Sequence, residues 1–211
     1  MKNTQKIIAF LVLFVAAFAC STKKDTVVSR NFHAITTKYN VLFNGKEAFK
    51  KGIEDINNNY KDDWFQRLPI EPIEFEEDKI VLSSFNNNGP GAGFGSNEDE
   101  EKKELTTFEK AEEKAVKAIQ RHGMNIDGIE RNRQIDDAYL LLGKSRYYTQ
   151  RFIPAIEAFN YVIANYPQAD LIAETKIWRA KANTRNDNEE IAIEAMKLLL
   201  VVRDSLETSL P

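Results

Sequence analysis

The sequence predicts an all-α protein built from helical hairpins, with an extended and glycine-rich segment between them. Apolar residues recur at helical spacing over most of the chain after residue 31, and glycine or proline often marks the end of such a stretch. The composition, 43% hydrophobic and 29% charged, is that of an ordinary soluble protein. The net charge of −3 and the lack of a clustered basic face argue against a nucleic-acid partner.

The stretch from residue 137 to residue 167 predicts two helices packed against each other. Gly143 is the informative residue, because a glycine inside a helix costs about 1 kcal/mol relative to alanine. We expect the close approach of a neighbouring helix to compensate for this cost. Gln150 and Arg151 are expected to form the turn, and Pro154 suits the first turn of the second helix.

The order of small and large residues in this stretch resembles the tetratricopeptide repeat, which has a period of about 34 residues. The positions that pack the repeat are occupied by Tyr139, Leu142, Gly143, Ala155, Phe159 and Pro167. Arg146 departs from the pattern, which has tyrosine there, and Tyr147 is expected to take over its packing. Because Ala192–Ala195 echoes Ala155–Ala158, residues 107–211 are predicted to form tetratricopeptide-like repeats of an α-solenoid.

The amino-terminal residues have the features of an export signal. Lys2 and Lys6 precede an apolar run, Ile7–Ala19, which is too short to span a membrane and ends at Cys20, the only cysteine. We expect 1–19 to be a lipoprotein signal peptide and Cys20 to carry acyl chains that anchor the protein to a membrane. A plain secretory signal that happens to end in cysteine is the alternative. Residues 20–30 are predicted to be a polar tether.

The region between the tether and the repeats is predicted in three parts. Residues 31–60 are expected to form an amino-terminal helical hairpin, with a helix stop at Asn44–Gly45. Two prolines, Pro69 and Pro72, make 61–84 an extended segment that docks either on this chain or on a partner. Residues 85–106 are rich in glycine, asparagine and then acidic residues, which is typical of a disordered linker.

No residue set in the sequence predicts catalysis, a metal site, a cofactor or a small-molecule substrate. There is no Ser/His/Asp or HExxH arrangement, His33 lies among apolar neighbours, and His122 suits a helix end before Gly123. We therefore expect a non-catalytic protein whose partner-binding surface is a groove on the concave side of the repeats. The residues predicted to line this groove are Leu141, Lys144, Tyr148, Arg179 and Asn183.

Three stretches beside the lipoprotein start carry a more specific resemblance: NFHAITTKYNVLFNG, the central repeat and KIWRAKANTRND. With them the chain resembles the amino-terminal part of the repeat-containing SprE/PorW lipoproteins of type IX secretion and gliding motility. The resemblance implies an exported lipoprotein at the outer membrane, facing the periplasm. Its partners would be protein components of the machinery, linking the motor to the secretion apparatus. The alternative is a cell-wall (peptidoglycan or glycan) binding lipoprotein that uses Trp64, Phe65 and Trp178.

Overall fold

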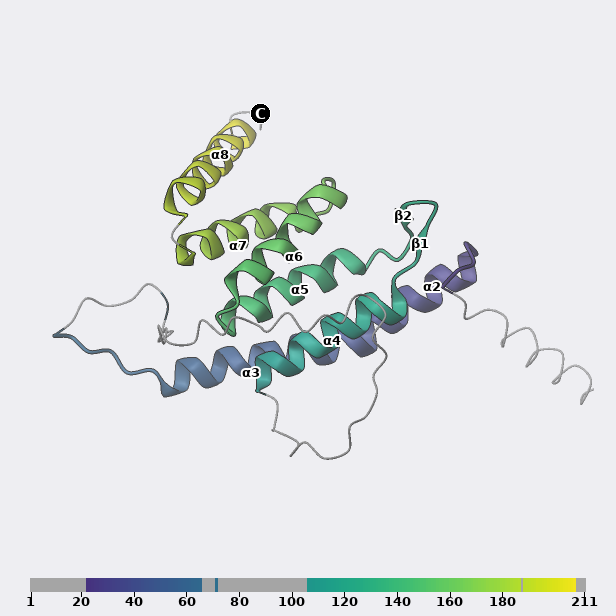
Figure 1. Cartoon of the computed structure of the whole chain (residues 1–211), viewed down its shortest axis with the longest axis horizontal. Helices are drawn as coiled ribbons and strands as arrows, with labels where there is room; N and C mark the ends of the chain where they lie inside the picture. The colour runs from purple at the N-terminus through teal and green to yellow at the C-terminus, as the bar shows by residue number, and fades with distance from the viewer. Residues whose placement is uncertain (1–21, 66–70, 72–105, 187, 208–211) are drawn as a thin grey trace, which may run out of the picture.

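The chain is all-α, as the sequence predicts. The computed structural model describes residues 22–65, 71, 106–186 and 188–207, most of which are helical (Figure 1). The elements are α2 (Val27–Thr36), the π-helix η1 (Thr37–Leu42), α3 (Phe43–Asn59), α4 (Thr107–His122), β1 (Asn125–Ile126), β2 (Ile129–Glu130), α5 (Ile135–Tyr148), α6 (Phe152–Asn165), α7 (Ile172–Arg185) and α8 (Glu189–Glu207). Within these ranges, no helix combines the length and the apolar character needed to cross a bilayer.

Several predicted features lie outside the described residues. They are the signal peptide at 1–19, the lipidated Cys20 and nearly all of the linker at 85–106. The extended segment 61–84 is described only at 61–65 and at residue 71.

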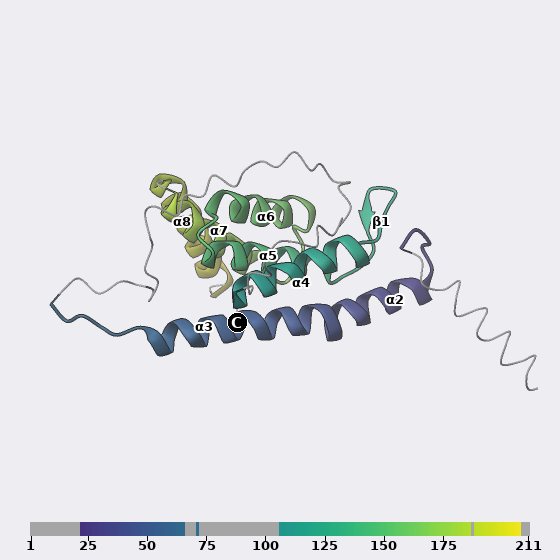
Figure 2. The ribbon, with the colours of Figure 1, turned by 60° about the horizontal axis from the view of Figure 1, so that its bottom comes forward.

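Each helix packs against the next one along the chain. Contacts join α3 to α4, α4 to α5, α5 to α6, α6 to α7 and α7 to α8, which gives one continuous array (Figures 1 and 2). Alternate helices also touch, α3 with α5 and α5 with α7. These alternate contacts decide which side chains of α5 and α7 are covered and which are accessible.

The amino-terminal hairpin predicted over 31–60 is wrong. The structure has one long helix there, in which α2, η1 and α3 follow each other without a chain reversal (Figure 2). Asn44 and Gly45, the predicted stop, lie inside α3. A Cβ at Gly45 would lie 2.9 Å from Leu141 Cδ2 and 3.1 Å from Lys114 Cβ. The glycine therefore permits the close approach of α4 and α5 and does not end the helix.

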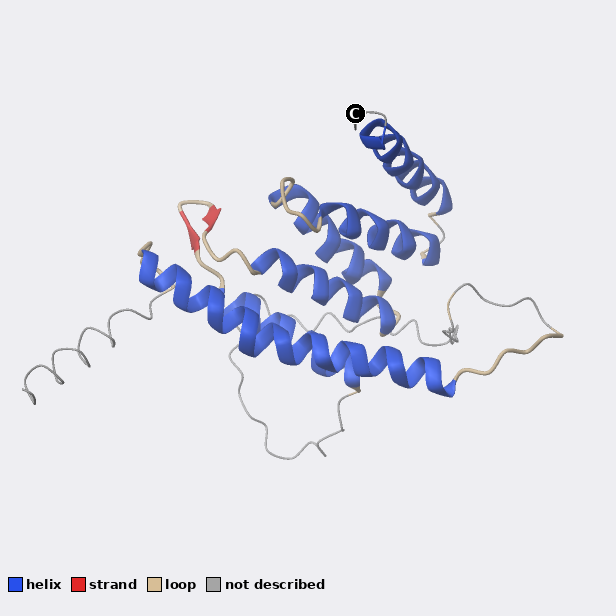
Figure 3. Ribbon diagram, turned by 180° about the vertical axis from the view of Figure 1, so that it is seen from behind, coloured by secondary structure: helices blue, strands red, loops and turns tan. Residues whose placement is uncertain are grey.

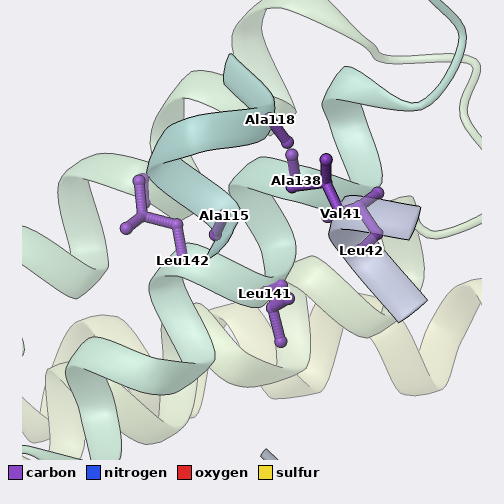
Figure 4. Packing of buried hydrophobic residues seen from close by; sticks show 8 residues of the cluster. Val41, Leu42, Ala115, Ala118, Ala138, Leu141 and Leu142 are labelled. Carbon is purple, nitrogen blue, oxygen red and sulfur yellow. The ribbon is translucent and has the colours of Figure 1, made fainter. Parts of the chain in front are cut away.

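Helix α4 joins the long helix to the rest of the array. Thr106 and Glu109 form a capping box at its start, where the Thr106 N–H donates to the Glu109 carboxylate at 2.7 Å. Its buried face carries alanines, whose small side chains let η1 and α5 approach closely (Figure 4). The resulting core cluster contains Val41, Leu42, Ala115, Ala118, Ala138, Leu141, Leu142 and Ala158.

Helices α5 and α6 meet at Gly143. A Cβ at this position would lie 2.3 Å from Phe159 Cε1 and 2.7 Å from Phe159 Cδ1 and Cζ, so a larger residue does not fit without movement. The chain reverses at Gln150, which has a left-handed φ of 61°. The contact between a helical glycine and a neighbouring helix that the sequence predicts is thus present in the structure.

The other residues at the positions of the repeat pattern differ in how deeply they are buried. Leu142 and Ala155 are buried, Tyr139 is half-buried, and Pro167 is exposed just after the end of α6. Tyr139 stacks on Tyr161 of α6 with ring centroids 4.0 Å apart. The hairpin contact is thus centred on small and apolar residues, and the outer positions are partly accessible.

Arg146, which departs from the repeat pattern, forms an ion pair and a backbone hydrogen bond where the pattern has an aromatic ring. Its Nε donates to Glu112 of α4 at 3.0 Å, and one of its terminal nitrogens donates to the Pro154 carbonyl of α6 at 3.1 Å. Arg151 donates to the same Glu112 carboxylate. Tyr147 is buried and packs in an apolar cluster with Ala155 and Phe159 of α6 and Ala182 of α7. One half-buried carboxylate therefore connects α4 to the α5–α6 hairpin.

A short β-hairpin connects α4 to α5. Strands β1 and β2 pair antiparallel through Ile126 and Ile129 and project from the array (Figure 3). Both turn residues have positive φ, 53° at Asp127 and 78° at Gly128. An Asp-Gly pair adopts this turn readily, and it is the sequence signal that indicates the hairpin.

The long helix and α4 also meet through two histidines. His33 Nδ1 of α2 lies 3.1 Å from His122 Nδ1 of α4. Burial lowers the pKa of both side chains, and the charges of His33, Lys117 and Arg121 lower that of His122 further. Such a hydrogen bond needs at least one neutral ring, so the neutral forms stabilise this contact.

Candidate functional site

Helices α5 and α7 face each other through aromatic rings. Tyr147 and Tyr148 of α5 meet Trp178 of α7 edge to face, with centroids 5.5 Å and 6.0 Å apart. Tyr148 also stacks on Phe108 of α4, at 4.8 Å and an interplanar angle of 7°. Rings held from several sides have little freedom, so this cluster is a rigid support for the polar groups next to it.

Two cations of α7 lie beside these rings. Lys181 Nζ is 4.1 Å from the centre of the Trp178 ring and 5.5 Å from that of Tyr147, both within cation–π range. Arg185 follows one turn later on the same helix face, with its Nε 3.4 Å from the Tyr147 hydroxyl. We call Tyr147, Trp178, Lys181 and Arg185 the carboxylate site.

Glu71 of the same chain occupies the carboxylate site. The Tyr147 hydroxyl donates to Glu71 Oε2 at 2.6 Å, and the Lys181 ammonium donates to Oε1. A terminal nitrogen of Arg185 lies 3.7 Å from Oε2. Only 16% of the Glu71 side chain is exposed, whereas 30% of Lys181 and 33% of Arg185 are. The three donors thus surround the carboxylate; Lys181 and Arg185 remain partly exposed, whereas Tyr147 is buried.

The surroundings of Glu71 favour its charged form. Burial by itself would raise the pKa of Glu71, but the hydrogen bonds from Lys181 and Tyr147 and the charges of Lys181 and Arg185 outweigh burial and lower that pKa. Burial and the hydrogen bond to Glu71 raise the pKa of Tyr147 well above its usual range, so its hydroxyl stays a proton donor. A phenol, an ammonium and a guanidinium together are suited to binding one carboxylate.

Lys144 lies beside the same tryptophan but has a different partner. Its Nζ is 5.3 Å from the centre of the Trp178 ring, and it donates to Glu174, also on α7. Burial would raise the pKa of Glu174, and the hydrogen bond and charge of Lys144 lower it overall. This ion pair connects α5 to α7 outside the carboxylate site.

Two of the residues predicted to line an exposed groove are buried. Leu141 is 4% exposed and lies against Gly45 of α3 (Figure 4 shows its side chain). Asn183 is 6% exposed, and its amide donates to the Arg179 carbonyl at 3.0 Å. Their placement in the groove is therefore wrong. The repeat pattern describes contacts inside one hairpin and contains no information on how α3 covers α5.

The other three predicted residues are half-buried and have different neighbours. Tyr148 packs among Phe108, Trp178 and Tyr147, whereas Lys144 pairs with Glu174. Arg179 donates to Asn160 of α6 at 3.2 Å. Lys144 and Arg179 thus contact different helices, α7 and α6, and their role in partner binding stays a prediction.

Sequence reasoning missed the carboxylate site. Lys181 and Arg185 are spaced i,i+4 on a helix that also carries Trp178, and this spacing is a signal for one basic face beside an aromatic ring. The partner residue has no such signal, because Glu71 lies 76 positions before Tyr147 in the sequence.

The fold and the site together define an all-α protein with consecutively packed helices and a basic, aromatic face that binds a carboxylate. No protein-family model matches the chain, and no curated protein matches it either. The functional interpretation therefore depends on the sequence patterns and on the geometry described above.

Proposed function

We propose that this protein is a non-catalytic scaffold of tetratricopeptide-like helix pairs that binds other proteins. The observation that carries the proposal is the consecutive packing of α3 to α8, with a Gly143–Phe159 contact at the positions that the repeat pattern assigns. In this proposal α5 and α6 form one repeat and α7 and α8 the next. Helices α3 and α4 correspond to a preceding repeat with an elongated first helix.

Two accessible surfaces support an interaction role. One is the carboxylate site on α5 and α7, where Lys181 and Arg185 are partly exposed. The other is an apolar stripe along α2, η1 and α3. Apolar residues scattered singly over a surface are common, whereas a continuous apolar stripe is typical of an interaction surface. Its exposed members are Val27, Val28, Phe32, Ile35, Tyr39 and Phe43.

We further propose that the scaffold is an outer-membrane lipoprotein of type IX secretion and gliding motility. In this role Cys20 carries the acyl chains, the helical array faces the periplasm, and the protein links the motor to the secretion apparatus. The resemblance of the amino-terminal and central stretches to the SprE/PorW lipoproteins supports this assignment. Several acyl chains on one cysteine anchor a protein firmly, whereas a single chain binds only marginally.

Crosslinking in living cells tests the scaffold role. Cells that produce the tagged chain are crosslinked, and the captured proteins are identified by mass spectrometry. We expect components of the secretion and motility machinery to be enriched over a tagged, unrelated periplasmic lipoprotein. We also expect that deleting the gene abolishes secretion and gliding. Secretion and gliding at the parental level after deletion would refute the assignment.

The cell-wall-binding alternative depends on exposed aromatic residues. Trp64 and Phe65 are 78% and 100% exposed, which is compatible with binding to glycan. Trp178, the third residue expected in such a groove, packs between Tyr147, Tyr148 and Lys181 instead. Sedimentation with purified sacculi, abolished by Trp64→Ala, would favour this alternative over the scaffold.

A further inference from the structure

The carboxylate site has the features of a binding site whose ligand comes from outside the helical array. Its donors, Tyr147, Lys181 and Arg185, belong to two packed helices and are supported by Trp178. Its ligand, Glu71, belongs to neither these helices nor their connections. A rigid scaffold thus holds the donors, and a separate part of the chain supplies the ligand. This arrangement resembles a receptor that binds a peptide.

We propose that the carboxylate site binds one acidic side chain of an extended partner peptide, and that Glu71 is an internal ligand which the partner displaces. The proposal deepens the scaffold function proposed above and rests on it. It specifies the chemistry of the partner segment and predicts that the chain regulates its own binding.

The local sequence of the internal ligand indicates the chemistry of the partner. Glu71 stands between Ile70 and Pro72. A residue before proline is disfavoured in the helical region, so an acid followed by proline favours an extended peptide as the ligand. In a partner peptide, apolar residues beside the acid would suit the half-buried ring of Trp178, which lies next to Lys181. The partner segment is therefore an extended peptide with a glutamate flanked by apolar residues.

Displacement of Glu71 is energetically feasible. The ion pairs involve cations that are about a third exposed, and ion pairs near the surface stabilise a structure only weakly. A ligand in the same chain has an effective concentration of roughly millimolar. A partner that makes further contacts along the array competes successfully with such a ligand, whereas a short peptide competes poorly.

Binding of a synthetic peptide tests the proposal. A fluorescent peptide with the sequence of residues 67–75, RLPIEPIEF, is added to the full chain, and its anisotropy gives the dissociation constant. We expect the peptide to bind Glu71→Gln about tenfold or more tightly than the wild type, because the internal competitor is removed. A peptide with glutamine in place of the glutamate at position 71 should bind both proteins weakly and equally.

Variants of the site separate the carboxylate contact from general effects. In the Glu71→Gln background, Lys181→Gln and Tyr147→Phe should each weaken binding of the peptide. Tyr147→Phe removes one hydroxyl and keeps the packed ring, so it tests the hydrogen bond without opening the core. Lys176→Gln is the matched control on α7, since none of the contacts to Glu71 described above involves Lys176. Circular dichroism and melting temperature establish that each variant folds.

Two results would overturn the proposal: equal affinity of the peptide for wild type and Glu71→Gln, or unchanged affinity after both Lys181→Gln and Tyr147→Phe. The outcome is distinguishable from a failure of the scaffold function. If the peptide does not bind but crosslinking in cells still captures the machinery, only the carboxylate site is refuted. If the peptide binds as expected but deletion of the gene leaves secretion and gliding intact, only the cellular role is refuted.

Discussion

Replacing Gly143 by alanine tests the close contact between α5 and α6. The added Cβ would lie 2.3 Å from Phe159 Cε1 and 2.7 Å from two further ring atoms. Carbon atoms in ordinary contact are about 3.5–4.0 Å apart, so the ring and the α5 backbone must separate by more than about 1 Å. Phe159 is fully buried, so its ring cannot move out of the way without displacing its neighbours.

Two opposing effects set the size of the change. Overpacking of a well-packed core costs about 1–3 kcal/mol, and the steep overlap with a buried ring favours the upper end of that range. Alanine recovers about 1 kcal/mol of helix propensity relative to glycine. We therefore expect Gly143→Ala to lower the free energy of unfolding by about 2 kcal/mol in total, the difference between these effects.

Urea unfolding followed by far-ultraviolet circular dichroism measures this change. Gly45→Ala is the matched comparison, because its Cβ would meet the flexible end of Leu141 at 2.9 Å, and we expect a smaller loss of stability. In a Phe159→Leu background the penalty of Gly143→Ala should shrink, since the ring that causes the overlap is absent. A Gly143→Ala protein as stable as the wild type would refute the close contact.

Three other expectations concern pH, an ion-pair network and lipidation. Since burial lowers the folded-state pKa of His33 and His122 below the ordinary value of 6.5, the unfolded chain binds more protons below that pH. The contribution of these two histidines to the free energy of unfolding should therefore be constant above about pH 6.5 and fall on acidification towards the lower folded-state pKa, and the fall should be shallower in His33→Gln. Glu112→Gln removes the charged acceptor of two partly exposed arginines and should cost up to about 1 kcal/mol, seen as a slightly lower melting temperature; an unchanged melting temperature would show that the network contributes nothing. Cys20→Ala should shift the protein from the membrane fraction to a soluble or uncleaved form, whereas equal incorporation of radiolabelled lipid by both proteins would exclude Cys20 as the acylated residue.

The sequence by itself determined those structural features that depend on residues close together in the chain. Helical periodicity identified the all-α class, and the order of small and large residues indicated a close helix contact at Gly143, which the structure makes with Phe159. These features are local, because each involves side chains that one helix or one hairpin brings together. The Asp127–Gly128 turn is of the same local kind, because its positive φ angles suit an Asp-Gly pair.

The tertiary structure alone decided what covers each helix. A glycine such as Gly45 either ends a helix or admits a neighbour, and the choice depends on α4 and α5, which follow much later in the chain. Leu141 is buried for the same reason, since α3 lies over its face of α5. The carboxylate site required Glu71 to meet Tyr147 across 76 positions of sequence. Periodicity places a side chain on one face of its helix. Whether that face is buried, and which charged groups meet there, depends on contacts between elements that are distant in the sequence.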